Sequence, residues 1–130
     1  MDSIGQKLKK TRIIKNLKIS DVSKELRISE EILNNFETEH LQKDINPVFL
    51  IGHLRSYCSF LKLDEKEIVK QMIPYIENQY QNGNKVSKIT RHMLGLFSGR
   101  PGAKGWRKVL SENAHSSGPE IVLQALSEVE

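Results

Sequence analysis

The stretch that decides the fold is "SDVSKELRISEEILNNFETE", residues 20–39, because it contains two helix starts close together. Ser20 and Ser29 are both suitable N-cap residues, and they predict short helices over 21–26 and near 30–39. The apolar residues of each helix recur at helical spacing, which places them on one buried face: Val22, Leu26, Ile32, Leu33 and Phe36.

The segments on either side also have helical signals. A first helix begins near Ile4 and ends at Asn16, a residue type that tolerates the left-handed conformation found after helices. Three short helices joined by short turns form the helix-turn-helix pattern. Asn46 followed by Pro47 marks the start of a fourth helix, and Asp64 with Glu67 the start of a fifth.

The fifth predicted helix runs through Met72, and Pro74 is expected to kink or end it. The polar, turn-rich stretch that follows is typical of a linker. The sequence therefore predicts an all-α protein with a five-helix domain over 1–77, a linker over 78–87 and a short helical tail over 88–130.

Charge is distributed unevenly along the chain. Residues 1–28 hold eight bases and three acids, residues 29–46 hold five acids and one base, and residues 85–108 hold seven bases and no acid. Two basic zones around an acidic one predict contact with polyanions at particular faces, although such runs are also common on solvated helices. One cysteine and no signal-peptide pattern predict a cytoplasmic protein.

Little in the sequence predicts catalysis. Cys58 lies in an apolar helical stripe, where a free cysteine is usually a small buried hydrophobe. The histidines at 40, 53, 92 and 115 match no zinc spacing, and "SGRPGAKG" lacks the strand and ending of a phosphate-binding loop. We therefore expect no catalytic residue, no metal and no cofactor, and we interpret the chain as a non-enzyme.

The first half resembles the cytoplasmic domain of the RodZ family, an offshoot of the Xre/Cro-type helix-turn-helix proteins. The resemblance covers residues 4–73, and its most specific part is Pro47-Val48-Phe49, Gly52, Leu54-Arg55 and Tyr57. It implies a five-helix, lambda-repressor-like domain that binds the bacterial actin MreB in cell-shape control, and it implies that Arg12 pairs with Glu37. The family's transmembrane and periplasmic parts have no counterpart in this sequence.

The tail resembles the C-terminal end of the tRNA-dihydrouridine synthases, of the A subgroup, over residues 88–130. Matching residues include Arg91-His92-Met93, Pro101-Gly102, Trp106-Arg107 and Leu110-Ser111-Glu112. In those enzymes this region helps to seat tRNA, whereas their flavin-binding barrel and catalytic cysteine have no counterpart here. Without the barrel the segment lacks most of that RNA surface, and its seven bases can neutralise only a few phosphates. We therefore expect weak, salt-sensitive and non-specific contact with tRNA and interpret the tail as an inherited fragment.

Three binding hypotheses follow. DNA contact, either weak or as a sequence-specific transcriptional regulator, would use Lys18, Lys24, Arg27, Ser29, Asn34 and Asn35, but the recognition helix carries four glutamates that oppose phosphate binding. A protein interface, including one with a second copy of the chain, would use Phe49, His53, Tyr57 and Phe60 unless the aromatic rings seal the core. RNA contact would use Arg91, Arg100, Lys104, Arg107 and Lys108, with Trp106 as the core anchor of the tail.

Overall fold

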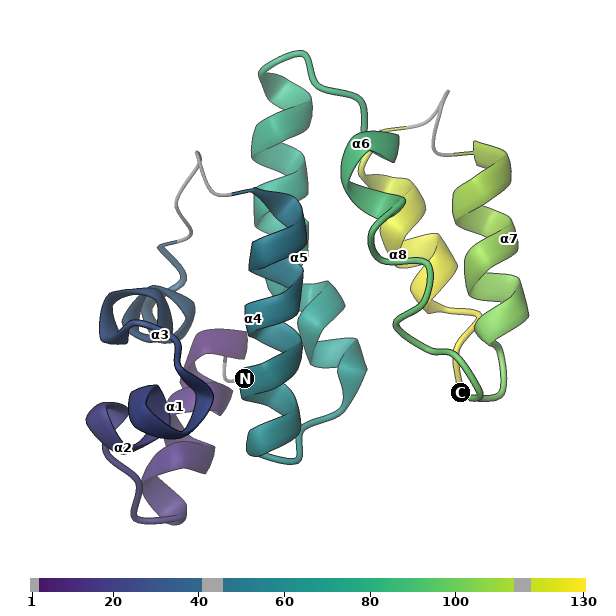
Figure 1. Cartoon of the computed structure of the whole chain (residues 1–130). Coiled ribbons are helices and arrows are strands. Elements are labelled where there is room, and N and C mark those ends of the chain that lie inside the picture. Colours follow the sequence, from purple (N-terminus) through teal and green to yellow (C-terminus); the bar gives the residue numbers. More distant parts are fainter. Residues whose placement is uncertain (1–2, 41–45, 114–117) are drawn as a thin grey trace. The chain divides into compact units, whose positions relative to one another are not determined.

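The computed structural model describes residues 3–40, 46–113 and 118–130, and within them every regular element is a helix. The all-α prediction is therefore confirmed. The elements in chain order (Figure 1) are α1 (Ile4–Ile14), α2 (Ile19–Leu26), α3 (Glu30–Thr38), α4 (Pro47–Phe60), α5 (Glu65–Gln81), α6 (Ser87–Thr90), α7 (Ala103–Asn113) and α8 (Glu120–Leu126).

The chain divides into two compact units, which we call unit 1 (Met1–Gln71) and unit 2 (Met72–Glu130). The division falls inside α5, earlier than the predicted domain end at residue 77. Helix α5 also continues past Pro74 to Gln81, so the first part of the predicted linker is helical. Proline removes one backbone donor, which a long helix with a buried face tolerates: Met72, Tyr75 and Ile76 are all buried.

The helix starts of unit 1 follow local chemistry. The hydroxyl of Ser3 accepts from the Gln6 backbone N–H (3.3 Å) and the Gln6 side chain accepts from the Ser3 N–H (2.8 Å), which makes a capping box for α1. Asn16 has φ 57°, so the predicted left-handed residue after α1 is confirmed. The predicted cap of α2 is wrong: Lys18 rather than Ser20 is the N-cap, because Asp21 accepts from the Lys18 N–H at 2.9 Å.

The starts of α3 and α4 agree with the sequence. The Ser29 hydroxyl accepts from the Ile32 N–H at 3.2 Å, and the Asn46 side chain accepts from the Val48 N–H at 2.8 Å. Pro47 occupies the first turn of α4, where no backbone donor is needed. These caps set the helix-turn-helix arrangement of α2 and α3, which pack on each other, and α3 also packs on α1.

Each unit has its own apolar core. In unit 1 the most deeply buried side chains come from α1 to α5: Leu8, Val22, Leu33, Phe36, Leu54, Tyr57 and Ile68. In unit 2 they come from α5 to α8, with α7 packed along α8: Ile76, Met93, Phe97, Trp106, Leu110, Val122 and Ala125. The predicted tail is thus part of a packed helical unit rather than an appendage without a core.

Candidate functional site: a basic groove in unit 2

A groove of about 270 Å³ lies between α6 and α7, inside unit 2. Its wall contains two basic side chains, three hydroxyl-bearing side chains and no acid: Ser87, Lys88, Thr90, Arg91, Leu94, Leu110 and Ser111. Lys88 and Arg91 are exposed, so both cations can reach a ligand in solution. Its two cations and three hydroxyls could bind an anion such as a phosphate group, while Leu94 and Leu110 make part of the wall apolar.

Trp106 fixes the position of the groove. Its side chain is completely buried, and its Nε1–H donates to the Met93 carbonyl oxygen at 3.0 Å. The indole also meets the Phe97 ring edge to face, with centroids 4.9 Å apart at 84°. Trp106 therefore holds the segment that carries Arg91 against α7, and because it is buried it is not available for stacking on a base.

The outer face of α7 extends the positive charge beyond the groove. Lys104, Arg107 and Lys108 are all exposed, while Trp106 and Leu110 of the same helix are buried. Arg107 lies four residues before Ser111, which lines the groove, so both are on the same side of the helix. Four of the five residues predicted for RNA contact are thus exposed, and one of them, Arg91, lines the groove.

Arg100, the fifth predicted RNA-contact residue, has a different environment. It is half-buried, its Nε donates to the Glu130 carbonyl oxygen at 2.7 Å, and its guanidinium lies 5.6 Å from the centre of the Phe97 ring. These contacts tie the C-terminal end of the chain to the core of unit 2. We therefore assign Arg100 a structural role and leave it out of the basic groove.

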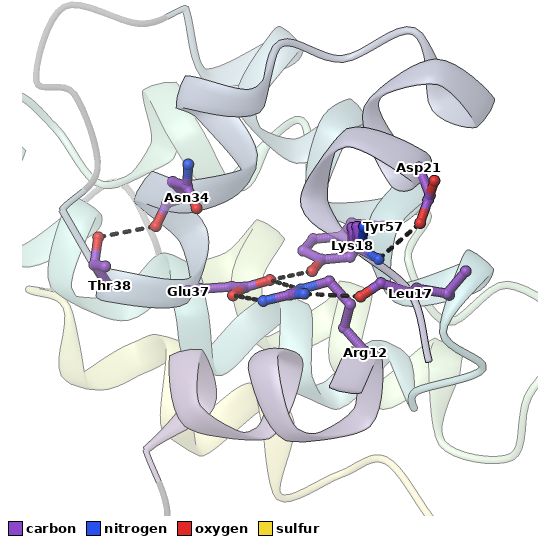
Figure 2. A network of polar contacts seen from close by, with 8 residues as sticks. All are labelled: Arg12, Leu17, Lys18, Asp21, Asn34, Glu37, Thr38 and Tyr57. Atoms are coloured by element: carbon purple, nitrogen blue, oxygen red, sulfur yellow. Dashed lines mark hydrogen bonds and ion pairs between the residues drawn. The ribbon is translucent and has the colours of Figure 1, made fainter. Parts of the chain in front are cut away.

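Unit 1 contains a buried charged network (Figure 2). The Arg12 guanidinium binds Glu37 through two bonds, Nε to Oε2 at 2.8 Å and Nη2 to Oε1 at 3.0 Å, so the pair that the resemblance implies is present. Arg12 also donates to the Leu17 carbonyl oxygen at 2.8 Å. The Tyr57 hydroxyl donates to Glu37 Oε2. Burial raises the pKa of Tyr57, and the bond to Glu37 raises it further.

The network corrects the predicted protein interface on α4. Tyr57 is completely buried, so the prediction that it belongs to an exposed contact surface is wrong. Its hydroxyl binds the carboxylate of Glu37, twenty residues earlier on α3. The spacing of residues along α4 does not indicate this contact. Phe49, one of the rings that could have sealed the core, is instead 63% exposed, and its ring stacks on the half-buried His53 with the ring centroids 6.4 Å apart. Phe60 is half-buried.

The residues predicted for DNA contact lie on α2, on α3 and at the starts and ends of these helices. Lys18, Lys24 and Arg27 are exposed, and Arg27 has φ 57° at the end of α2. Ser29 uses its hydroxyl as the cap of α3, Asn34 is exposed and Asn35 is half-buried. The first turn of α3 presents Glu30 and Glu31 to solvent, which suits the helix dipole but repels a phosphate backbone.

Among the described residues no group of three or more histidine, cysteine, aspartate or glutamate side chains could hold a metal ion. His115 lies outside the described residues. Cys58 is buried, and burial, with smaller contributions from Glu67 and Glu65, raises the pKa of its thiol to about 12. This environment is the opposite of the one that activates a cysteine nucleophile.

No helix among residues 3–40, 46–113 and 118–130 is long and apolar enough to cross a membrane.

The stability of unit 1 should therefore fall at alkaline pH. In the unfolded chain the Cys58 thiol, with a pKa near 9, loses its proton as the pH rises, while the folded thiol keeps it up to about pH 12. The stabilisation is thus fully present below pH 9 and is lost above it, by about 2 kcal/mol between pH 9 and pH 10.5. Urea unfolding at both values measures this loss, and Cys58→Ala should lose less. Equal losses in both proteins would contradict the assignment.

Two family models match this chain. The model of a helix-turn-helix domain matches residues 7–68, and the model of the dihydrouridine synthases matches residues 47–130. The tRNA-dihydrouridine(20/20a) synthase of Vibrio vulnificus is 52% identical over 66 residues, which are 49% of this chain and 20% of that protein. The one of Shewanella oneidensis is 42% identical over 84 residues (63% and 25%), and that of Escherichia coli K12 53% over 58 residues (45% and 17%). No solved structure matches significantly.

The fold and the groove thus define a helix-turn-helix unit joined to a helical unit that carries a basic groove. Because the matching model covers well over half of the chain, this protein belongs to the dihydrouridine synthase family. The interpretation of the chain as a non-enzyme is therefore corrected: the family to which it belongs is a family of enzymes. The chain spans between about a sixth and a quarter of the length of the relatives it matches.

The comparisons also move one boundary. The synthase similarity begins at residue 47 in the family model rather than at residue 88, and it overlaps the helix-turn-helix match over α4 and the start of α5. Sequence reasoning also missed Lys88 and Ser111 of the groove. A signal was present for Lys88, because it is one of the seven bases in the acid-free zone, but nothing local identified Ser111.

Proposed function

We propose that unit 2 contacts tRNA through the groove between α6 and α7 and the exposed bases beside it. The observation that carries the proposal is the separation of roles in unit 2: Trp106 is completely buried, while Arg91 and Arg107 stay exposed around an acid-free groove. Relatives with this segment are named tRNA-dihydrouridine synthases, so tRNA is the polyanion to test. In such an enzyme the groove would hold backbone phosphates, which position a nucleic acid without reading bases.

The expectation of non-specific binding rested on a short tail that lacked a rigid surface. Unit 2 instead has its own core, and the matching segment is longer than residues 88–130. A-form RNA is recognised by shape and by contacts to phosphates and 2′-hydroxyls, which requires a preformed surface. A packed basic unit supplies such a surface, so we infer a preference for tRNA over duplex DNA, with modest affinity that falls with salt.

Filter binding of the full chain to purified tRNA, at several salt concentrations, tests the proposal. Arg91→Ala with Arg107→Ala should weaken binding and reduce the salt slope by about 2, because each phosphate contact contributes about 1. Lys9→Ala with Lys15→Ala removes the same charge from exposed positions in unit 1 and should leave the tRNA slope nearly unchanged. Equal affinity for tRNA and duplex DNA, or equal effects of the two double variants, would refute the assignment.

We infer that unit 1 acts as a binding module of helix-turn-helix type. Its exposed Phe49, stacked on His53, supports a protein contact on α4 more than the acidic first turn of α3 supports DNA contact. Bacterial actin is the partner that the RodZ resemblance implies, and cytoplasmic location and cell-shape control remain predictions with it. The measurement that decides between a protein contact and DNA contact is binding of purified bacterial actin by the full chain. This binding should be lost in Phe49→Ser.

A further inference from the structure

The outward face of α1 combines exposed apolar and basic side chains. Ile13 is 52% exposed and Ile14 is 80% exposed, at the C-terminal end of the helix. Lys9 lies four residues before Ile13, and Lys10 four residues before Ile14, so each lysine is on the same side of the helix as an isoleucine. Both lysines are exposed, and the helix contains no acidic residue.

The basic character continues past the end of α1. Lys15 and Lys18 are exposed in the turn that leads to α2, where Asn16 adopts the left-handed conformation. Asp21 lies close to this turn, but its carboxylate accepts from the Lys18 backbone N–H and so caps α2. We call Ile13, Ile14 and the lysines at 9, 10, 15 and 18 the α1 tip.

The α1 tip is built on a rigid base. The other side of the helix is fixed by Leu8, which is completely buried, and by Arg12, which is bound to Glu37. A side chain placed on Gly5 would come within 2.2 Å of the Glu37 carbonyl oxygen, so α1 and α3 approach each other closely there. The isoleucines therefore cannot turn inward without disrupting the core of unit 1.

We propose that the α1 tip binds an anionic lipid surface. Apolar side chains surrounded by lysines match the boundary between acyl chains and negatively charged headgroups, because the isoleucines can insert while the lysine stems extend toward the phosphates. A nucleic acid offers the same negative charge but no apolar layer for Ile13 and Ile14. The exposed isoleucines therefore favour a membrane over nucleic acid, and the lysines restrict it to an anionic one.

Co-sedimentation of the full chain with large vesicles tests the proposal. We expect binding to vesicles of phosphatidylcholine with 30% phosphatidylglycerol, and none to phosphatidylcholine alone, since binding needs both insertion and charge. Raising the salt should weaken the binding. Ile13→Gln with Ile14→Gln should reduce the partition coefficient by about tenfold or more, because it removes the inserted apolar area.

Two comparisons make the test specific. Val48→Gln with Phe49→Gln removes two other exposed apolar residues, 50% and 63% exposed, from α4 of the same unit and should leave vesicle binding unchanged. The isoleucine variant should also leave tRNA binding unchanged, which separates this proposal from the one for unit 2. No binding to anionic vesicles, or a loss caused by Lys9→Ala with Lys15→Ala but not by the isoleucine changes, would overturn it. A change in sedimentation velocity caused by the isoleucine variant without vesicles would assign the α1 tip to a second copy instead.

Discussion

Replacing Glu37 with leucine is expected to lower the stability of unit 1 by about 3–5 kcal/mol, the cost of removing one partner of a buried ion pair. The Arg12 side chain is only 11% exposed, and its charge would lose both bonds to Glu37 and keep the one to the Leu17 carbonyl oxygen. The Tyr57 hydroxyl would lose its acceptor as well. A buried donor without a partner adds to the cost.

The chain offers a clean measurement of this effect. Its single tryptophan lies in unit 2, so fluorescence reports that unit, while circular dichroism reports both. In Glu37→Leu, urea unfolding followed by circular dichroism should show an earlier transition. The double change Arg12→Met with Glu37→Leu should be less destabilising than Glu37→Leu alone, because no unpaired charge remains. A loss below about 1 kcal/mol in Glu37→Leu would contradict a role for the network in holding α1, α3 and α4 together.

Local chemistry explains which parts of the fold the sequence could predict. Ser29, Asn46 and Pro47 act within two or three residues of themselves, so the starts of α3 and α4 were predictable. The start of α2 is also set locally, but the predicted cap was Ser20, whereas the Asp21 carboxylate accepts from the Lys18 N–H and starts the helix earlier. Local signals therefore identify the helices better than they identify their ends.

Long-range packing explains what the sequence could not predict. Helix α5 continues through Pro74 because Met72, Tyr75 and Ile76 around it are buried, and the proline itself gives no sign of that buried face. Tyr57 has the spacing of a contact residue on α4, but its role is set by Glu37 on another helix. The groove in unit 2 likewise brings Lys88 and Ser111 together from different helices. The bases of the site were predictable from charge, whereas its shape was not.

Replacing Gly102 with alanine should strongly destabilise unit 2. Gly102 has φ +91°, a conformation that costs an L-residue about 1–2 kcal/mol. A Cβ atom there would also lie 2.0 Å from the Glu128 carbonyl oxygen and 2.8 Å from the Val129 Cα, so the backbone at the C-terminal end would have to move. Val129 is buried, and such overpacking typically costs a further 1–3 kcal/mol.

Gly99→Ala provides the matched control for Gly102→Ala. Gly99 also has a positive φ, +82°, but a Cβ atom there would meet nothing within 4 Å. Gly99→Ala should therefore lose only the conformational cost, about 1–2 kcal/mol of the free energy of unfolding, whereas Gly102→Ala should lose about 3 kcal/mol or more. Tryptophan fluorescence during urea unfolding measures the loss in both variants. Gly102 directly precedes α7, and its carbonyl oxygen accepts from the backbone N–H of Trp106 at 3.0 Å. Equal losses in the two variants would mean that the C-terminal residues do not pack on Gly102. In that case the support that Arg100 and Glu130 give to the core beside the basic groove would also be in question.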